Sequence, residues 1–406
     1  MKNNLPKLRF PEFSGEWSLA IVGDLCNSIV PGRNKPVLFD GNIPWITIPD
    51  ITSSKISNSI NNLYVSENEA NQQGCKILPS GAVIMSCVGE FGIVGISADR
   101  IIINQQLHSF VCNDELINYF LMYSLITKIY FMEQIATKSS VSYMNKESCN
   151  SIPIYYPSIE EQSKIADFLT SIDDKIQQLT QKEELLEQYK KGVTQQIFSQ
   201  KIRFKDDNGN DYPDWEEKNL GDISKQYYQG INTTADALKY NDSGYPILQA
   251  KHITDEVISY DDVKFVNQID YDRYREKYKP KLNDILISNI GTIGKIVLIE
   301  NDMEFLIAWN IFKVTLSEKN LSPRFITFAL KKKSSEGYFE SIKTGNATKF
   351  VNKEDMLSTN IPIPNFEEQT KISDLLTSID DKITQVNTQL EKTKLFKKAL
   401  LQQLFI

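Results

Sequence analysis

The feature that most constrains this chain is an internal duplication. Residues 159–165 (IEEQSKI) match residues 366–372 (FEEQTKI), and residues 169–176 and 376–383 are both LTSIDDKI at the same offset. A repeat of this kind indicates two similar structural units that bury their apolar faces against their neighbours. The sequence therefore predicts two related halves rather than one continuous domain.

The duplication extends more weakly towards the start of each half. Residues 81–92 (GAVIMSCVGEFG) match residues 283–294 (NDILISNIGTIG), and Trp17 aligns with Trp215. Residues 8–10 (LRF) also resemble residues 202–204 (IRF), so the N-terminal segment copies the connector between the halves. The halves are related as if circularly permuted, which predicts an approximate two-fold arrangement with two antiparallel helices.

The matched stretches carry apolar residues at helical spacing. Pro157 and Pro364 mark the helix starts, with Ser158 and Asn365 as N-cap residues. A seven-residue register predicts a coiled-coil-like pair. Its members are Ile165, Ile172, Leu179, Leu186 and Val193 in the first copy and Ile372, Ile379, Val386 and Leu400 in the second.

Each helix follows a variable segment with β-branched runs and glycine turns, which is typical of an α+β domain. The predicted fold class is α+β, with two similar domains joined by two long antiparallel coiled-coil-like helices in a pseudo-two-fold repeat. Strands are expected at 82–85, 101–103, 284–287 and 295–299, and helices at 115–134 and 323–341. The expected division is an N-terminal segment 1–16, a first domain 17–158, a first helix 159–200, a linker 201–214, a second domain 215–364 and a second helix 365–406.

Composition excludes several classes of protein. The most apolar stretch, residues 81–96, contains Glu90 and is too short to span a bilayer, and residues 1–10 lack the apolar core of a signal peptide, so a cytoplasmic location is expected. With two histidines and no cysteine pair at ligand spacing, no metal site is expected. The five cysteines are expected to be reduced thiols. The net charge of -7 argues against non-specific coating of nucleic acid.

Catalytic motifs are absent from the sequence. There is no GxxxxGK[ST] loop for ATP and no Asn-Pro-Pro-Tyr or Asp-Pro-Pro-Tyr segment of the kind that holds a flipped adenine. The paired carboxylates at 173–174 and 380–381 lie inside the predicted helices, where adjacent positions point apart, so they are interpreted as surface charges rather than a general acid and base. We expect no catalytic residue in this chain.

The repeated EEQxKI and LTSIDDKI strings, together with PWITIPDI at 44–51 and DILISNIGTIGK at 284–295, resemble the specificity (S, or HsdS) subunit of type I restriction-modification systems. The resemblance covers nearly the whole chain. The two halves differ within these strings. The first half has Ala82 where the second has Asp284, and it has no lysine that matches Lys295.

The resemblance implies two target-recognition domains that read the two parts of a bipartite, asymmetric site in double-stranded DNA. It also implies two modification (methyltransferase) subunits and restriction (endonuclease and translocase) subunits as partners. S-adenosylmethionine, ATP and Mg would then belong to those partners, with no cofactor in this chain. The alternative from another class is a coiled-coil scaffold that joins protein partners and never contacts DNA. A self-sufficient methyltransferase is disfavoured by the missing motifs.

Polar residues in loops where the two halves match in pattern but differ in identity are the candidates for DNA contact. Glutamines can bind adenine through two hydrogen bonds, and lysines can bind phosphate or guanine. The predicted DNA-binding residues are Gln105, Gln106, Lys138, Ser139, Tyr143, Lys251, Lys295, Lys343, Asn346 and Lys349. The second domain also holds a basic stretch of Arg273, Arg275, Lys277, Lys279 and Lys281.

Polar residues that are identical in both helix copies are the candidates for partner binding. None of them has an evident role in an apolar seam, so two equivalent docking sites would explain them, although shared ancestry alone is an alternative. The predicted partner-binding residues are Glu161, Gln162, Asp173, Asp174, Lys175, Glu368, Gln369, Asp380, Asp381 and Lys382.

Overall fold

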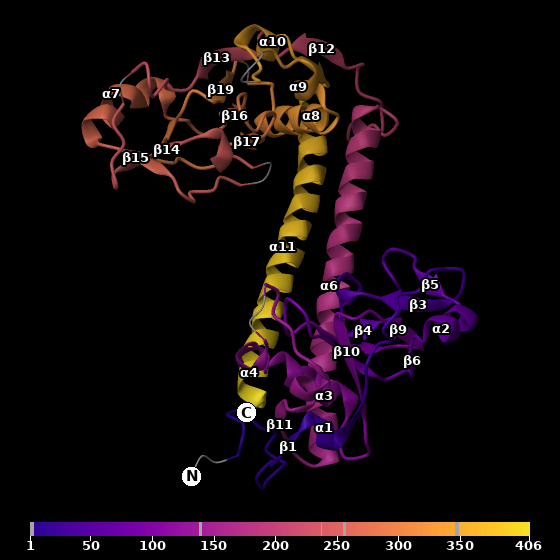
Figure 1. The fold of residues 1–406 in the computed structure, drawn as a ribbon. Coiled ribbons are helices and arrows are strands. Elements are labelled where there is room, and N and C mark those ends of the chain that lie inside the picture. The colour runs from indigo at the N-terminus through magenta and orange to yellow at the C-terminus, as the bar shows by residue number, and fades with distance from the viewer. Residues whose placement is uncertain (1–3, 138–139, 237, 255–256, 318, 346–348) are drawn as a thin grey trace. The chain divides into compact units, whose positions relative to one another are not determined.

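The computed structural model describes residues 4–137, 140–236, 238–254, 257–317, 319–345 and 349–406. The chain divides into two compact units, Met1–Glu183 with Val386–Ile406, and Glu184–Gln385 (Figure 1). Each unit holds one α+β domain and a part of each long helix, which confirms the predicted fold class and its internal repeat.

Two long helices, α6 (Ile159–Phe198) and α11 (Phe366–Leu404), run through both units (Figure 1). In unit 1 the first turns of α6, at Ile165 and Leu169, pack with Leu400 and Leu404 near the end of α11. In unit 2 the arrangement is reversed, because the end of α6 at Ile197 packs against the start of α11. Within each unit the helices are therefore antiparallel, and the predicted apolar register faces the neighbouring helix.

Ion pairs at repeat-equivalent positions fix the helix register. In unit 2, Lys190 Nζ forms an ion pair with Asp380 Oδ1 at 2.6 Å. In unit 1, Lys397 forms the equivalent ion pair with Asp173. The Asp173 carboxylate also accepts a hydrogen bond from the Tyr123 hydroxyl at 2.7 Å. These aspartates therefore join the helices to each other, and in unit 1 to the domain.

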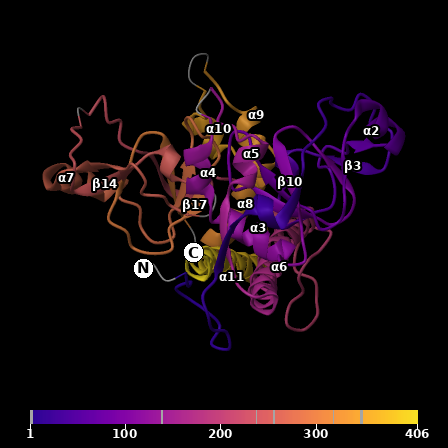
Figure 2. The ribbon, with the colours of Figure 1, turned by 60° about the horizontal axis from the view of Figure 1, so that its bottom comes forward.

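The domain of unit 1 contains a five-stranded sheet in the order β2-β10-β7-β8-β4, a four-stranded sheet in the order β5-β3-β9-β6, and the pair β1-β11. The strands are β1 (Ser18–Ile21), β2 (Cys26–Ile29), β3 (Ile43–Ile46), β4 (Lys55–Ile56), β5 (Tyr64–Val65), β6 (Ile77–Leu78), β7 (Val83–Ser86), β8 (Val94–Ser97), β9 (Ile101–Ile103), β10 (Leu107–Cys112) and β11 (Pro153–Tyr156). The helices are α1 (Val22–Leu25), η1 (Ile48–Asp50), α2 (Glu67–Gln73), α3 (Asn118–Ile126), α4 (Ile129–Ile135) and α5 (Lys146–Asn150). Figure 2 shows α2 and β3 together at one side of this unit.

The domain of unit 2 repeats this plan with sheets in the orders β13-β19-β16-β17 and β15-β14-β18 and the pair β12-β20. Its strands are β12 (Glu216–Asn219), β13 (Ser224–Gln229), β14 (Tyr245–Leu248), β15 (Lys264–Val266), β16 (Ile285–Ser288), β17 (Ile296–Leu298), β18 (Leu306–Ile307), β19 (Ile311–Leu316) and β20 (Asn360–Ile363). Its helices are η2 (Ala250–His252), α7 (Gln268–Tyr278), α8 (Pro323–Ser335), α9 (Tyr338–Ser341) and α10 (Lys353–Leu357).

The predicted helices at 115–134 and 323–341 are each broken in two. The first is divided at Thr127 and Lys128, where α3 ends and α4 begins. The second is divided at Gly337, whose φ of +80° is left-handed and ends the helical run. The predicted strands are present, and their ends differ from the prediction by at most one residue.

One difference between the two halves has a direct structural explanation. Asp284 is buried and accepts hydrogen bonds from Thr315 Oγ1 at 2.5 Å and Lys281 N at 2.8 Å, and the Lys313 ammonium lies 3.7 Å away. In the sheet of unit 1 the matching positions of Asp284 and Lys313 are Ala82 and Ser109, which are buried as well. The acid and the base are thus replaced together, as expected because a buried charge without its partner is costly.

None of the helices in the described part of the chain has an apolar stretch long enough to span a bilayer. Among the same residues, no group of three or more His, Cys, Asp or Glu side chains converges as metal ligands would.

A buried histidine makes the stability of unit 1 sensitive to acid. Burial, together with the charge of Lys146, lowers the pKa of His108 to about 4, below the usual 6.5. Because the folded pKa is depressed, the stabilisation is present above pH 6.5 and is lost as the pH falls from 6.5 towards 4. At the matching position in unit 2 the residue is Phe312. Between pH 7 and pH 4 the native protein should lose up to about 3 kcal/mol of unfolding free energy through this histidine, and the His108→Phe variant should not. Urea unfolding at several pH values measures this, and equal acid sensitivity of the two proteins would contradict it.

Candidate nucleic-acid interface and helix junctions

Three separate segments of unit 1 meet at the glycine turn between β7 and β8. Cys87 N donates to Gln106 O at 2.9 Å, and Met144 N donates to Cys87 O at 2.9 Å. Gly89, whose φ is +81°, donates from its N–H to Ser142 O at 2.8 Å. These main-chain bonds hold Gln106 and the loop of Tyr143 beside the turn without using their side chains.

Unit 2 builds the same framework between β16 and β17. Asn289 N donates to Asn310 O at 3.2 Å, and Val351 N donates to Asn289 O at 2.9 Å. The backbone of Phe350 pairs with Thr344 and Ile290. The two domains therefore present equivalent loop clusters with different side chains.

The predicted DNA-binding residues of unit 1 that the structure describes lie on this cluster. Gln105, Gln106 and Tyr143 are exposed. Gln105 Nε2 donates to Gly32 O at 2.8 Å and to Asn34 O at 3.3 Å, so its amide is committed within the chain. Gln106 Oε1 accepts only a local bond, from Asn104 Nδ2 at 3.1 Å, among the contacts described. Lys138 and Ser139 lie outside the described residues.

The predicted residues of unit 2 are more dispersed. Lys349 is exposed on the loop cluster, Lys343 pairs with Glu340, and Lys295 is half-buried at the start of β17. Lys251, on η2, forms an ion pair with Asp262 at 2.6 Å. Asn346 lies outside the described residues.

The basic stretch around α7 is largely neutralised by neighbouring acids. Lys279 lies 2.5 Å from Glu304 and 3.1 Å from Asp302, and Glu304 raises the pKa of this lysine. Arg275 pairs with Asp272 at 3.5 Å. Because these cations are already paired within the chain, the stretch is a weaker phosphate-binding candidate than its sequence indicates.

Two groups of candidate residues were missed from the sequence. Arg33 and Lys35 are exposed on the loop whose carbonyl groups bind Gln105. Trp309 and Asn310 occupy the positions that match Gln105 and Gln106. The first pair directly precedes β19, which pairs with β16, and the second directly precedes β10, which pairs with β7. The Trp309 side chain is 44% exposed. Extending the repeat alignment through this loop would have found Trp309.

The start of each long helix carries a buried acid that is bound by an arginine from the segment before the domain, which is the N-terminal segment in unit 1 and the linker 201–214 in unit 2. In unit 1, Arg9 Nε and Nη2 each lie 2.7 Å from a different oxygen of Glu161. This fork-to-fork geometry is the strongest form of the arginine–carboxylate pair. The N-terminal segment also reaches α11, because Leu8 N donates to Gln403 O at 3.0 Å.

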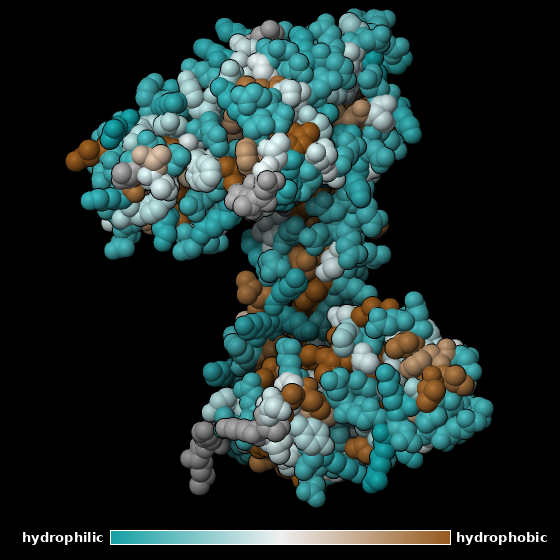
Figure 3. All heavy atoms as spheres, turned by 45° about the horizontal axis from the view of Figure 1, so that its top comes forward, coloured by the Kyte–Doolittle hydropathy of each residue, from teal (hydrophilic) through white to brown (hydrophobic). Residues whose placement is uncertain are grey.

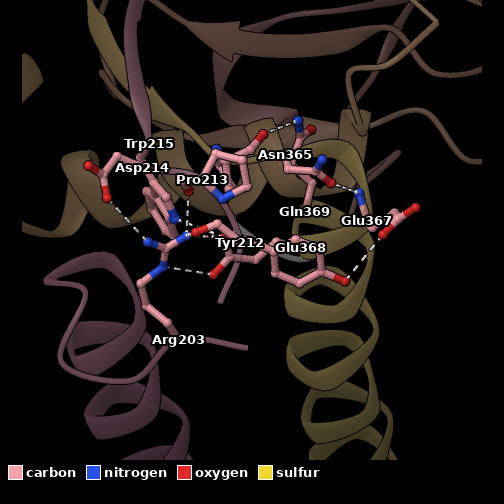
Figure 4. Close-up of polar contacts among 10 residues, drawn as sticks. Arg203, Tyr212, Pro213, Asp214, Trp215, Asn365, Glu367, Glu368 and Gln369 are labelled. Carbon is pink, nitrogen blue, oxygen red and sulfur yellow. Dashed lines mark hydrogen bonds and ion pairs between the residues drawn. The ribbon is translucent and has the colours of Figure 1, made fainter. Parts of the chain in front are cut away.

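The junction in unit 2 is equivalent but has one more donor (Figure 4). Arg203 Nε and Nη2 bind the two oxygens of Glu368 at 3.2 and 2.7 Å, and Trp215 Nε1 also donates to Glu368 at 3.1 Å. In unit 1 the matching Trp17 Nε1 is buried without a described partner. Glu368 thus accepts three described hydrogen bonds, two from Arg203 and one from Trp215, whereas Glu161 accepts two, both from Arg9.

The glutamine after each buried acid fastens the domain to the helix. Gln162 Oε1 accepts from Ile117 N at 2.9 Å, and its Nε2 donates to Glu115 O and Pro157 O, each at 2.9 Å. Gln369 repeats all three bonds in unit 2 with Ser322 N, Asn320 O and Pro364 O.

These contacts correct part of the partner-binding prediction. Glu161, Gln162, Glu368 and Gln369 are at most 1% exposed and are bound within the chain, so their repetition reflects an internal role rather than a docking surface. Asp173 and Asp380 are partly buried in the inter-helix ion pairs. Four predicted docking residues are exposed, and for them the prediction stands: Asp174, Lys175, Asp381 and Lys382.

Comparison with known proteins shows consistent similarities. The sequence model of the family described as "Type I restriction modification DNA specificity domain" matches residues 15–188 and 212–394. The chain is 22% identical to the type I restriction enzyme MjaVIII specificity subunit of Methanocaldococcus jannaschii, with 98% of this chain and 93% of that subunit covered. It is 24% identical to the MjaIX specificity subunit of the same organism, over 63% of this chain and 61% of that subunit.

Solved structures share the fold. The type I restriction-modification S subunit from M. genitalium superposes with a TM-score of 0.64 at 16% identity, covering 99% of both chains. A chain from a structural study of assembly and conformational transition in the type I restriction-modification system gives a TM-score of 0.54 at 16% identity, covering 96% of both chains. At these identities the likeness concerns the fold.

The two junctions differ in how they tolerate loss of the arginine. Arg9→Ala leaves the Glu161 carboxylate buried with none of its described donors, whereas after Arg203→Ala the Glu368 carboxylate keeps the Trp215 indole. We expect Arg9→Ala to cost about 3–5 kcal/mol of unfolding free energy in unit 1. Arg203→Ala should cost unit 2 about 1–2 kcal/mol less, because one hydrogen bond to the charge remains.

Hydrogen exchange of α6 and α11 resolves the two units and measures this difference. Arg203→Ala combined with Trp215→Phe is the matched control and should remove the difference. Equal losses from the two single substitutions would show that Trp215 contributes nothing to holding Glu368.

Proposed function

Because the chain belongs to the family of type I restriction-modification DNA specificity domains, it is a DNA-recognition protein, and we propose that each of its two domains reads one part of a bipartite, asymmetric DNA sequence. The observation that carries this proposal is the pair of equivalent loop clusters with unlike side chains, Gln105 and Gln106 in one and Trp309 and Asn310 in the other. A scaffold that joins only proteins has no use for this difference, and the family match decides against that alternative.

In unit 1 the proposed reader is Gln106. A carboxamide pairs with adenine through two hydrogen bonds in the major groove. Gln105 would have to release Gly32 and Asn34 before it could do the same, so it serves better to hold the loop that carries Arg33 and Lys35. Those two cations are suited to the adjacent phosphates, which fix position without reading sequence.

In unit 2 the corresponding surface is less polar. The exposed indole of Trp309 offers an apolar face that suits a thymine methyl group. Asn310 Oδ1 accepts from Ala250 N at 3.2 Å, which orients the amide. Lys349 provides a nearby cation for phosphate. The two domains are therefore expected to prefer different bases.

The chemistry of methylation and cleavage is proposed to reside in partner subunits. The sequence has no ATP loop and no adenine-methylation motif, and the relatives are named specificity subunits. Modification subunits would bind S-adenosylmethionine, and restriction subunits would bind ATP and Mg. This chain would bind the target sequence on DNA and hold the partner subunits there. We expect it to be located in the cytoplasm.

The long helices offer two equivalent docking surfaces for modification subunits. Each repeats an exposed acid and base, Asp174 with Lys175 and Asp381 with Lys382. The other long helix of each unit carries an exposed aromatic ring at the same repeat position, Phe396 in unit 1 at 53% exposure and Tyr189 in unit 2 at 54%. Figure 3 shows apolar side chains at the surface of these helices, where a solvated helix face would ordinarily be polar.

The first test separates base reading from phosphate binding. Gln106→Ala should cost about 1–3 kcal/mol at one position of one half-site and relax the preference there. Arg33→Ala with Lys35→Ala should instead weaken binding to all sequences about tenfold and lower the slope of log affinity against log salt by about 1–2. Binding titrations of the assembled complex on a library of sites, at several salt concentrations, measure both effects.

Arg100→Ala is the matched control, because Arg100 belongs to the same domain and pairs with Glu67 on α2 at 2.7 Å. It should change neither the preference nor the salt slope. A changed base preference in the Arg33 and Lys35 variant, with none in Gln106→Ala, would reverse the assigned roles.

The second test concerns docking. Asp174→Arg combined with Asp381→Arg should reduce co-purification of the modification subunits at least tenfold while leaving thermal unfolding of this chain unchanged, because both side chains are exposed. Glu187→Arg is the control, since the repeat partner of this exposed acid is Lys394. Unchanged assembly in the double variant would place the docking surface elsewhere.

A further inference from the structure

Two of the five cysteines face each other across neighbouring strands. Cys26 opens β2 and Cys112 closes β10, and the two residues are directly opposite in the antiparallel ladder. Their sulfur atoms lie 3.8 Å apart, and both thiols are free. The next pair along the ladder is closed by a hydrogen bond from Asn113 N to Leu25 O at 2.9 Å, so Cys26 and Cys112 occupy a non-hydrogen-bonded pair.

This position meets the geometric requirement for a disulfide. Cα atoms in a non-hydrogen-bonded antiparallel pair are about 4.5 Å apart, within the range of roughly 4.4–6.8 Å found in disulfides. The sulfur atoms need to approach by less than 2 Å to reach the S–S bond length of about 2.05 Å. Rotation of the two side chains can supply that movement while the ladder stays in place.

Exposure and comparison with the other half single out this pair. Cys26 and Cys112 are partly exposed, whereas Cys75, Cys87 and Cys149 are buried. The matching positions in unit 2 are Ser224 and Leu316, which are also directly opposite in their ladder. Among the described residues, only the first domain therefore has two facing thiols at this place.

We propose that Cys26 and Cys112 are a redox-modification site that closes to a disulfide when a peroxide oxidises it. One thiol, as thiolate, attacks a peroxide oxygen to give a sulfenic acid and water. The second thiol then attacks the sulfenic sulfur, the S–S bond forms, and a second water leaves. The two thiols are oxidised by two electrons and hydrogen peroxide is reduced to two waters. The hydrogen bond to Cys112, and then burial, raise the pKa of Cys26, so this sulfur is protonated at neutral pH.

The disulfide would cross-link the first domain at a distance from the loop cluster that carries Gln106. It closes residues 27–111 into a loop, which contains most of that domain. Closing so long a loop restricts the unfolded chain and stabilises the folded one. The cysteines lie at one end of the β2–β10 ladder, and Gln106 precedes the other end of β10. Oxidation should therefore raise the stability of unit 1 and leave sequence recognition unchanged.

The test treats the full chain with hydrogen peroxide or with a reductant, and then alkylates the remaining thiols under denaturing conditions. We expect three alkylated cysteines after oxidation and five after reduction, a mass loss of 2 Da before alkylation, and a peptide that joins Cys26 to Cys112. Cys26→Ser and Cys112→Ser should each prevent the cross-link, and Cys75→Ser should not.

Thiol labelling during heating gives a second, unit-specific readout, because all five cysteines belong to unit 1. Labelling of buried Cys75 should require a temperature roughly 5–10 °C higher in the oxidised protein, and a reductant should reverse the shift. Five free thiols after oxidation, a sulfinic acid on Cys26, or a cross-link between Cys87 and Cys149 instead would overturn the proposal. A cross-link that forms without any shift in labelling temperature would refute its stabilising role.

Discussion

A carboxylate that is placed in the first turn of a helix and removed from water must be given a cation and hydrogen bonds, or the helix start is unstable. Glu161 and Glu368 are in this position, and each is bound by an arginine from the connector, a term that here includes the N-terminal segment that copies it. The connector is thereby drawn against the helix, and it leads directly into Trp17 or Trp215 and the strand that pairs with the end of the domain. The glutamine that follows each acid then binds the main chain where α3 or α8 begins. These polar contacts tie each domain to its helix beside the apolar core that the two share.

The parts of the fold that depend on local periodicity could be predicted from the sequence. The seven-residue spacing from Ile165 to Val193 identified the helix face that packs, because a helix must turn its apolar stripe towards a neighbour. Strand positions were found for a similar reason, since β7 and β16 are buried along their whole length. The break at Gly337 was not predicted, because an isolated glycine inside an apolar pattern is compatible with a continuous helix.

Roles that depend on which distant groups meet could not be predicted. Glu161 and Gln162 were assigned to a partner surface because they are identical in both helix copies and have no evident role in the apolar seam. No sequence pattern shows that Arg9 and the N–H of Ile117 will meet them. For the same reason Lys251 was expected to contact DNA, although Asp262 lies against it. Arg33 and Lys35 were overlooked because only the folded loop brings them to Gln105.

Unit 1 is assembled from two separate pieces of the chain, whereas unit 2 is continuous. A ribosome that makes the chain from its N-terminus releases the whole of unit 2 before it releases Val386–Ile406, the segment that supplies Leu400 and Leu404 to the core of unit 1. The domain that is translated first is therefore the last to be completed. During synthesis, the part of this core that Leu400 and Leu404 cover stays open until the last turns of α11 emerge, and a nascent chain in that state is exposed to aggregation or to capture by a chaperone.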